Sequence, residues 1–287
     1  MAERAHRACA LLFVLVLLGP LGMPAHAAEL KQKTIEAFDH YIRATEARRA
    51  EGLRDANSFL WVDRMPEAKR QNAYAQLRQG RIVVEHLNTR EEGKPIEIPS
   101  GLIHHWIGAV FIPGATLPQT LAIVQDYDNH QNIYKPDVQR SKLLQRDADS
   151  FKVYLRLHRK TIVTVVVNSE YEVRHTFDDA TRARSRSYST RIAEVEHPGE
   201  PHEREKPVGK DHGYLWRLYS YWRFQEKGGG VYVQLETVAL TRGVPPLFGW
   251  LVNPLLKSIP REALSHLLGS TRTAVSKRNA PGTNRPG

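Results

Sequence analysis

The stretch that decides the fold is residues 214–242, YLWRLYSYWRFQEKGGGVYVQLETVALTR. Two runs of aromatic and β-branched residues flank the turn EKGGG, which is typical of a β-hairpin. Because side chains alternate along a strand, each run presents two different faces. The more apolar face, which we predict to point into the protein, carries Trp216, Leu218, Ser220, Trp222 and Phe224 on the first strand and Val233 and Leu235 on the second.

The regions on either side of this hairpin predict a long antiparallel sheet closed by a helix. Strand-like segments lie near 102–112, 139–146, 151–159, 161–177 and 182–195, and a helix is expected over 118–126. The segment 260–275 predicts the last helix, because Leu264, Leu267 and Leu268 recur at helical spacing. Before residue 102, the segments 30–52 and 66–79 favour helices and 81–87 favours a strand. The fold class is therefore α+β.

Two short motifs add a family resemblance to this order of elements. Asp126-Tyr127 and Pro136-Asp137-Val138 follow the first internal helix, and SIPREAL (258–264), Leu267 and Thr271-Arg272 belong to the last one. Over residues 102–275 the chain resembles the START-like, or SRPBCC, superfamily of helix-grip domains, which includes polyketide cyclases and coenzyme-Q-binding proteins. The resemblance implies a curved antiparallel sheet around a long C-terminal helix. Residues 28–101 would be an N-terminal helical extension with a linker.

The resemblance also implies a cavity between the sheet and the last helix that holds an apolar small molecule. We expect the inward face of the hairpin, together with Leu264, Leu267 and Leu268, to line it. The favoured function is a binding protein for a hydrophobic or amphipathic molecule, such as a lipid or isoprenoid, that acts as a carrier. A cyclase- or hydratase-type enzyme on the same fold stays open as the alternative, because fold alone does not choose a function. A structural partner in an envelope complex, with the cavity filled by side chains, is a third alternative.

The N-terminus predicts export. Arg4 and Arg7 precede the apolar run LLFVLVLL (11–18), and Ala25-His26-Ala27 forms a small-x-small cleavage site. The run is too short to span a bilayer, which needs about 20 residues. Residues 1–27 are therefore expected to be a signal peptide, and the mature protein to be periplasmic or secreted.

The composition narrows the chemistry of the mature chain. The only cysteine, Cys9, would leave with the signal peptide, so neither a disulfide nor a thiol site is expected. The net charge of the whole chain is +10, and removing the signal lowers it by one unit. Such an excess favours anionic surfaces, among which export makes nucleic acid the least suitable partner.

Catalytic and metal-binding patterns are missing from the sequence. The adjacent His104 and His105 would point to opposite faces of a strand, and no helical histidine pair, serine elbow or phosphate-binding glycine loop occurs. The remaining acid–base candidates, whose spacing pairs no acid with a base, are Asp126, Asp128, His130, His158, His175 and Glu236. We predict no catalytic residue, no metal site and no cofactor.

Two further segments carry expectations. Arg182, Arg184 and Arg186 alternate with small residues, so the arginines should form an outer basic stripe while Ala183 and Ser185 point inward. The segment 243–256, GVPPLFGWLVNPLL, is expected to be an irregular lid over the cavity, with Phe248 and Trp250 able to contact a membrane. The alternative is that this segment packs as core. Residues 276–287 are expected to be a disordered basic tail.

Overall fold

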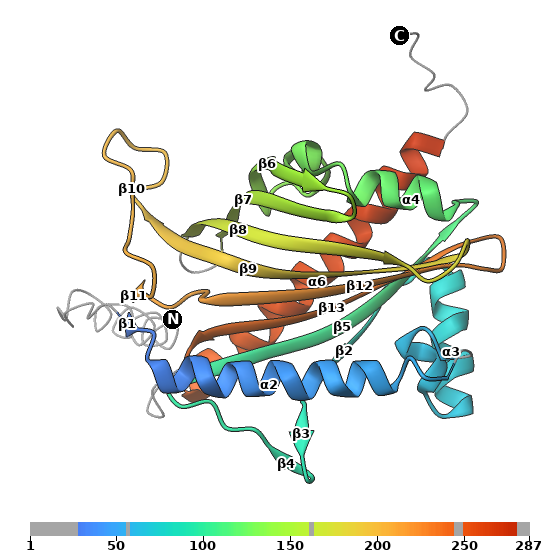
Figure 1. Ribbon diagram of the computed structural model, residues 1–287, viewed down its shortest axis with the longest axis horizontal. Coiled ribbons are helices and arrows are strands. Elements are labelled where there is room, and N and C mark those ends of the chain that lie inside the picture. Colours follow the sequence, from blue (N-terminus) through green and yellow to red (C-terminus); the bar gives the residue numbers. More distant parts are fainter. Residues whose placement is uncertain (1–27, 56–57, 161–163, 244–248, 280–287) are drawn as a thin grey trace, which may run out of the picture.

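A computed structural model describes residues 28–55, 58–160, 164–243 and 249–279; for residue 28 and for 249–258 it describes the backbone only. At its centre is a nine-stranded antiparallel sheet in the order β2-β5-β13-β12-β9-β8-β7-β6, with β10 paired to β9 (Figure 1). The strands are β2 (Val83–His86), β5 (Gly101–Pro113), β6 (Val138–Asp147), β7 (Ser150–Lys160), β8 (Thr164–Phe177), β9 (Arg182–Glu196), β10 (Arg204–Glu205), β12 (Arg217–Glu226) and β13 (Gly230–Arg242).

The hairpin forms as predicted. Strands β12 and β13 pair in continuous register from Arg217 opposite Leu240 to Glu226 opposite Val231, and the turn contains Gly228 and Gly229 at positive φ. Glycine reaches this backbone region without the steric penalty that a side chain would cause. The hairpin occupies the middle of the sheet, between β5 and β9, so both of its edges are paired with other strands.

Helix α6 (Gly249–Asn279) covers one face of the sheet, which we call the inner face. There Leu264 and Leu268 pack against Val110, Val233 and Phe224 in the largest apolar cluster of the protein. The same cluster includes α4 (Leu117–Val124), which is capped by Thr116 with Pro118 in its first turn. Near the far end of the sheet, η2 (Tyr127–Asn129) and α5 (His130–Ile133) place Tyr127 against Phe151 and Val153.

The opposite, outer face is covered by the N-terminal helices. Helix α2 (Gln32–Glu51) lies along the strands on the side away from α6 (Figure 1), and its Phe38 and Tyr41 pack against Val238 and Leu240. A second cluster joins η1 (Trp61–Arg64) and α3 (Glu67–Arg78) to β5 through Leu60, Leu77 and other residues. The short pairs β1 (Ala28–Glu29) with β11 (Lys210–Asp211), and β3 (Arg90–Glu91) with β4 (Lys94–Pro95), lie outside the main sheet.

Three boundaries differ from the expectation. The last helix begins at Gly249, before the expected residue 260, so residues 249–256 of the expected irregular lid are helical and that prediction is wrong for them. Pro254 removes one backbone donor, and the helix continues through it. The helix ends at Asn279, four residues into the expected tail. Strand β2, which precedes residue 102, pairs with β5 and forms one edge of the same sheet. Within the described residues, no helix combines the length and apolar character needed to cross a membrane.

Candidate functional site

The inner face of β12 and β13 forms a continuous apolar wall opposite α6. Trp222 and Phe224 stack with ring centroids 5.8 Å apart and planes only 3° from parallel. Phe224, Val233 and Leu235 are buried, as are Leu264 and Leu268 on the helix, while Leu267 packs at the edge of the same cluster. The structure therefore brings these hairpin and helix residues together, as strand alternation and helical spacing predicted.

The wall is closed at one position of β12 and partly open at the three others on the same face. Phe224 is fully buried, whereas Trp222, Ser220 and Leu218, on the same face, are all partly exposed. The neighbouring strand β9 places Ser185 opposite Trp222 and Ser187 opposite Ser220. These side chains are small, as the predicted inward-facing residues should be. An aromatic surface thus lies beside a strip of hydroxyl groups.

One buried polar group next to this strip is unsatisfied. Tyr171 on β8 pairs with Ser189 of β9 and Val153 of β7, which places it on the inner face. Its hydroxyl makes no hydrogen bond within the described part of the chain, and the nearby Ser169 hydroxyl donates to the Leu155 carbonyl at 2.8 Å. Burial raises the pKa of Tyr171 to about 12, so the phenol stays protonated. A buried hydroxyl without a partner is costly and is available to a polar ligand group.

Trp216 does not belong to this wall, and its predicted position is wrong. It lies one residue before β12 and packs against Phe38 and Tyr41 on the outer face. Its indole N–H donates to Asp211 at 2.9 Å. Alternation holds only within a regular strand, and a buried indole N–H needs an acceptor. The outer face supplies that acceptor, which explains the reversal.

The expected lid residues are only partly described. Phe248 lies outside the described residues, and Trp250 lies on the first turn of α6, where the backbone alone is described. Membrane contact by this segment therefore stays a prediction.

The outer face holds buried charge under α2. Glu236 of β13 is 2% exposed and accepts hydrogen bonds from Arg48 and Arg49 of α2 and, at 2.9 Å, from His105 of β5. Tyr41 lies 2.8 Å from the other ring nitrogen of His105. Burial alone would raise the pKa of Glu236, but His105 and the two guanidinium groups outweigh it and hold that pKa well below its usual range. This network anchors α2 to the sheet.

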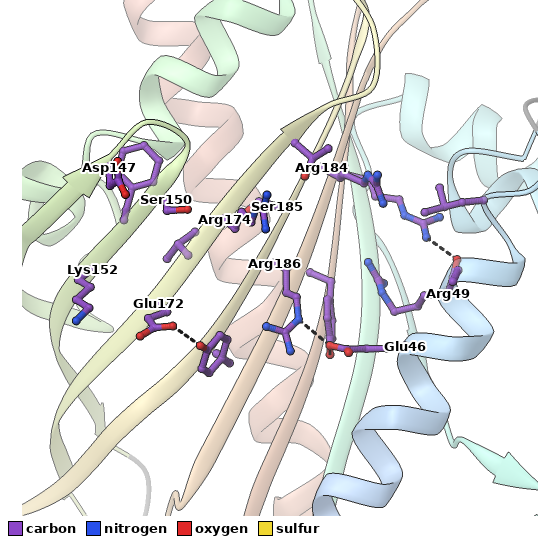
Figure 2. A pocket seen from close by; sticks show the side chains of 18 of the residues that line it. Glu46, Arg49, Asp147, Ser150, Lys152, Glu172, Arg174, Arg184, Ser185 and Arg186 are labelled. Carbon is purple, nitrogen blue, oxygen red and sulfur yellow. Dashed lines mark hydrogen bonds and ion pairs between the residues drawn. The ribbon is translucent and has the colours of Figure 1, made fainter.

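Beside α2 the outer face opens into a groove of about 680 Å³ (Figure 2). One wall comes from α2, with Glu46 and Arg49; the other comes from β9 and β8, with Arg184, Arg186 and Arg174. Arg186 donates to Glu46 across the groove at 2.7 Å. The arginines predicted as an outer stripe therefore lie on the outer face, where two of them line this groove.

The acid–base candidates are spread over both faces. Nε2 of His130 lies 3.0 Å from the Val124 carbonyl, and Nε2 of His175 lies 2.9 Å from the Tyr127 hydroxyl. Burial lowers the pKa of both histidines to about 4. These contacts stabilise the packing of the loops after α4. As predicted, His104 and His105 point apart: His104 contacts Thr241, and His105 contacts Glu236.

A group of possible metal ligands that the sequence analysis overlooked lies on the loop after β9. The ligand atoms of His197, Glu200 and His202 lie within 4.8 Å of one another, and all three residues are exposed. The loop turns at His197 and Gly199, which both have positive φ. Helical histidine spacing could not reveal this group, because the turn and not a helix brings the side chains together.

Of the comparisons with known proteins, only the one with solved structures found matches. No protein-family model matches the chain, and no curated protein matches its sequence. The solved structures similar to it include a fragment of a STAR-related lipid transfer protein from Xanthomonas axonopodis, at 19% identity and a TM-score of 0.47, covering 68% of this chain and 93% of that chain. A Streptomyces aromatase/cyclase shares 12% identity at a TM-score of 0.41, covering 63% and 99%, respectively. A START superfamily protein from Mycobacterium smegmatis shares 12% identity at a TM-score of 0.39, covering 62% and 99%.

The fold is START-like. The order of the strands and the position of α6 confirm the helix-grip architecture that the sequence predicted. All three TM-scores lie below 0.5 and all three identities below 20%, so neither ligand nor activity is transferred from these proteins to this START-like chain.

Proposed function

We propose that this protein binds a hydrophobic or amphipathic small molecule, of lipid or isoprenoid type, against the inner face of its sheet, and that it acts as a carrier. The observation that carries the proposal is the difference in exposure between Phe224 and the other inner-face residues of β12. The apolar wall is sealed at Phe224 and partly open at Trp222, Ser220 and Leu218. In a fully packed core the Trp222 ring would be covered by neighbouring side chains, because protein interiors are close-packed. Here it is partly exposed beside a row of serines.

The chemistry of the wall favours a ligand with an apolar body and one polar group. Burying apolar surface against Trp222 and Leu218 is worth about 25 cal/mol per Å². A hydroxyl or carbonyl on the ligand could pair with the Tyr171 hydroxyl, which has no partner in the described part of the chain. Satisfying a buried polar group in this way adds specificity as well as affinity.

We further propose that the protein acts outside the cytoplasm after cleavage following Ala27. Ala28 and Glu29 form β1 and pair with β11, and the Leu30 N–H donates to the Gly209 carbonyl at 2.8 Å. Cleavage at the expected site would leave this strand intact. N-terminal sequencing of the exported protein should begin at Ala28-Glu29-Leu30, whereas a product that retains residues 11–18 would contradict export.

Native mass spectrometry of protein purified from its own compartment tests the binding proposal. We expect a lipid-sized mass bound one to one, and loss of that mass in Trp222→Ala. Tyr219→Ala is the matched control, because Tyr219 lies on the same strand with its ring against Phe38 on the outer face. Equal retention by both variants, or no bound mass after incubation with membrane lipid extract, would refute the proposal. Turnover of the bound compound would instead indicate an enzyme.

A further inference from the structure

Two pairs of arginines lie directly opposite each other on the outer face of the sheet, on three adjacent strands. Arg223 of β12 pairs in register with Arg184 of β9, and Arg186 of β9 pairs with Arg174 of β8. Like charges directly opposite each other on one face of a sheet are destabilising. Two such pairs side by side lower the stability of the sheet, and we expect nearby negative charge to compensate for the repulsion.

The protein's own carboxylates offset only part of this charge. Arg184 donates to Asp178 at 3.0 Å and Arg186 to Glu46 at 2.7 Å. Arg174 is exposed, and no carboxylate or other partner contacts its side chain within the described residues. Glu236, whose charge acts on Arg223, is already shared by Arg48, Arg49 and His105.

Arg223 is the most unusual of the four. It is fully buried, and its two terminal nitrogens donate to backbone carbonyls, to Phe59 at 2.7 Å and to Arg49 at 3.4 Å. Its Nε has no partner among the described atoms. Burial, with the positive charges of Arg49 and Arg64, lowers the pKa of Arg223 to about 9. A buried guanidinium without a carboxylate is rare, because an uncompensated charge is expensive to desolvate.

All four arginines line the groove between α2 and the sheet. Figure 2 labels three of them, Arg174, Arg184 and Arg186. The cations that line it are Arg49, Lys152, Arg174, Arg184, Arg186 and Arg223, and the anions are Glu46, Asp147 and Glu172. Glu46 and Glu172 are engaged, by Arg186 and by the Tyr188 hydroxyl, respectively. Leu53, Tyr221 and Tyr188 add apolar and aromatic surface. A volume of about 680 Å³ falls within the range of small-molecule sites.

We propose that this groove binds the phosphate group of a phosphorylated small molecule or lipid headgroup. Several guanidinium groups on one wall match the multiple oxygens of a phosphate better than a single carboxylate, because each guanidinium can donate two parallel hydrogen bonds. The arginine side chains of this site and the apolar wall around Trp222 lie on opposite faces of the sheet. Arg174 and Lys152 are the uncommitted cations that would contact the incoming group first.

Isothermal titration calorimetry with the mature chain, residues 28–287, tests this proposal in low salt. The probes are inorganic phosphate, glycerol 3-phosphate, and vesicles of phosphatidylglycerol or of phosphatidylcholine. We expect saturable binding of glycerol 3-phosphate or of phosphatidylglycerol vesicles, with affinity reduced by about tenfold or more in Arg174→Gln. Arg174 is exposed, so the variant should fold. Arg261→Gln removes an exposed arginine from α6, outside the groove, and should change the affinity by less than about twofold.

The arms of the experiment distinguish the sources of the phosphate. Arg174-dependent binding of glycerol 3-phosphate supports a soluble ligand, and Arg174-dependent binding of phosphatidylglycerol vesicles alone supports a lipid headgroup. Equal losses in Arg174→Gln and Arg261→Gln would show general charge attraction and overturn the proposal. The absence of binding to any phosphate-bearing probe would overturn it as well.

Discussion

The two faces of the hairpin share one backbone but differ in the chemistry of their side chains. On the inner face, Trp222 and Phe224 meet Leu235 and Val233 in an apolar wall under α6. On the outer face of the same strands, Arg223 meets Gln234 and Tyr221 meets Glu236, all buried under α2 and η1. Neighbouring residues on one strand thus belong to two environments, one stabilised by apolar burial and the other by hydrogen bonds and ion pairs between buried polar groups.

This difference indicates that the two faces of the sheet have different roles. An apolar wall can lose a methyl group or gain a ligand at moderate cost, so its partly open end suits binding. A buried ionic network tolerates no missing partner, because the remaining charge stays desolvated. We infer that such a network, together with the apolar packing of Phe38 and Tyr41, fixes α2 to the sheet. The inner face and the groove beside α2 would then be the more adaptable regions.

The largest expected effect tests the rigidity of the outer face. Glu236→Ala would leave Arg48, Arg49 and His105 without their shared carboxylate, and removing one partner of a buried pair costs about 3–5 kcal/mol. Urea unfolding followed by circular dichroism measures this loss. Glu172→Ala, which removes a less buried carboxylate bonded to Tyr188, should cost less than about 1 kcal/mol. Similar losses in the two variants would mean that the network does not anchor α2.

The inner face should show a gradient along β12. Phe224→Ala removes a fully buried ring and should destabilise the fold by about 3–5 kcal/mol. Trp222→Ala removes a larger ring that is partly exposed, so its stability cost should be smaller and its effect on ligand retention larger. Equal costs in urea unfolding would show that the wall is uniformly packed core and would remove the argument for an open end.

Acid should destabilise both faces. Burial lowers the pKa of His104, His130 and His175 to about 4, and it also lowers the pKa of His105. The unfolded imidazole has a pKa of about 6.5, so between these values the unfolded state binds more protons. Stability is therefore lost as the pH falls from about 6.5 toward 4.

Urea midpoints measured at pH 7 and pH 5 should differ, with the lower midpoint at pH 5. His175→Gln should reduce this difference, because one neutral buried histidine is removed from the inner face. A midpoint that stays constant between pH 7 and pH 5 would contradict the burial of these rings.

The smallest expected effect concerns Trp216, whose face was predicted wrongly. Trp216→Phe keeps the apolar ring but leaves Asp211, which is buried, without the indole donor. We expect a loss of about 1–3 kcal/mol in urea unfolding. Asp211 keeps one backbone donor, the Gly213 N–H at 2.8 Å, which limits the cost. An unchanged midpoint would mean that this hydrogen bond contributes nothing.

Local patterns predicted most of the inner face. Alternation along β12 and β13 and the leucine spacing of α6 are short-range properties, so they identified Phe224, Val233 and Leu268 as neighbours. Patterns of this kind fail where the chain leaves regular structure, as at Trp216. They also could not place α2, because its contacts with Glu236 join residues almost 190 positions apart. The arginine groove depends on that docking and was therefore invisible as a cavity, although the outward direction of Arg184 and Arg186 was predicted.

The central claim is that the apolar ligand contacts the inner face, and adjacent residues of β12 can test it directly. A photoactivatable fatty acid or isoprenoid analogue would be crosslinked to the purified protein, and the modified residues located by peptide mass spectrometry. We predict adducts on Leu218 and Trp222, whose side chains share the inner face. Adducts on Tyr221 or Tyr188, which line the outer groove, would place the ligand on the opposite side of the sheet and contradict the account.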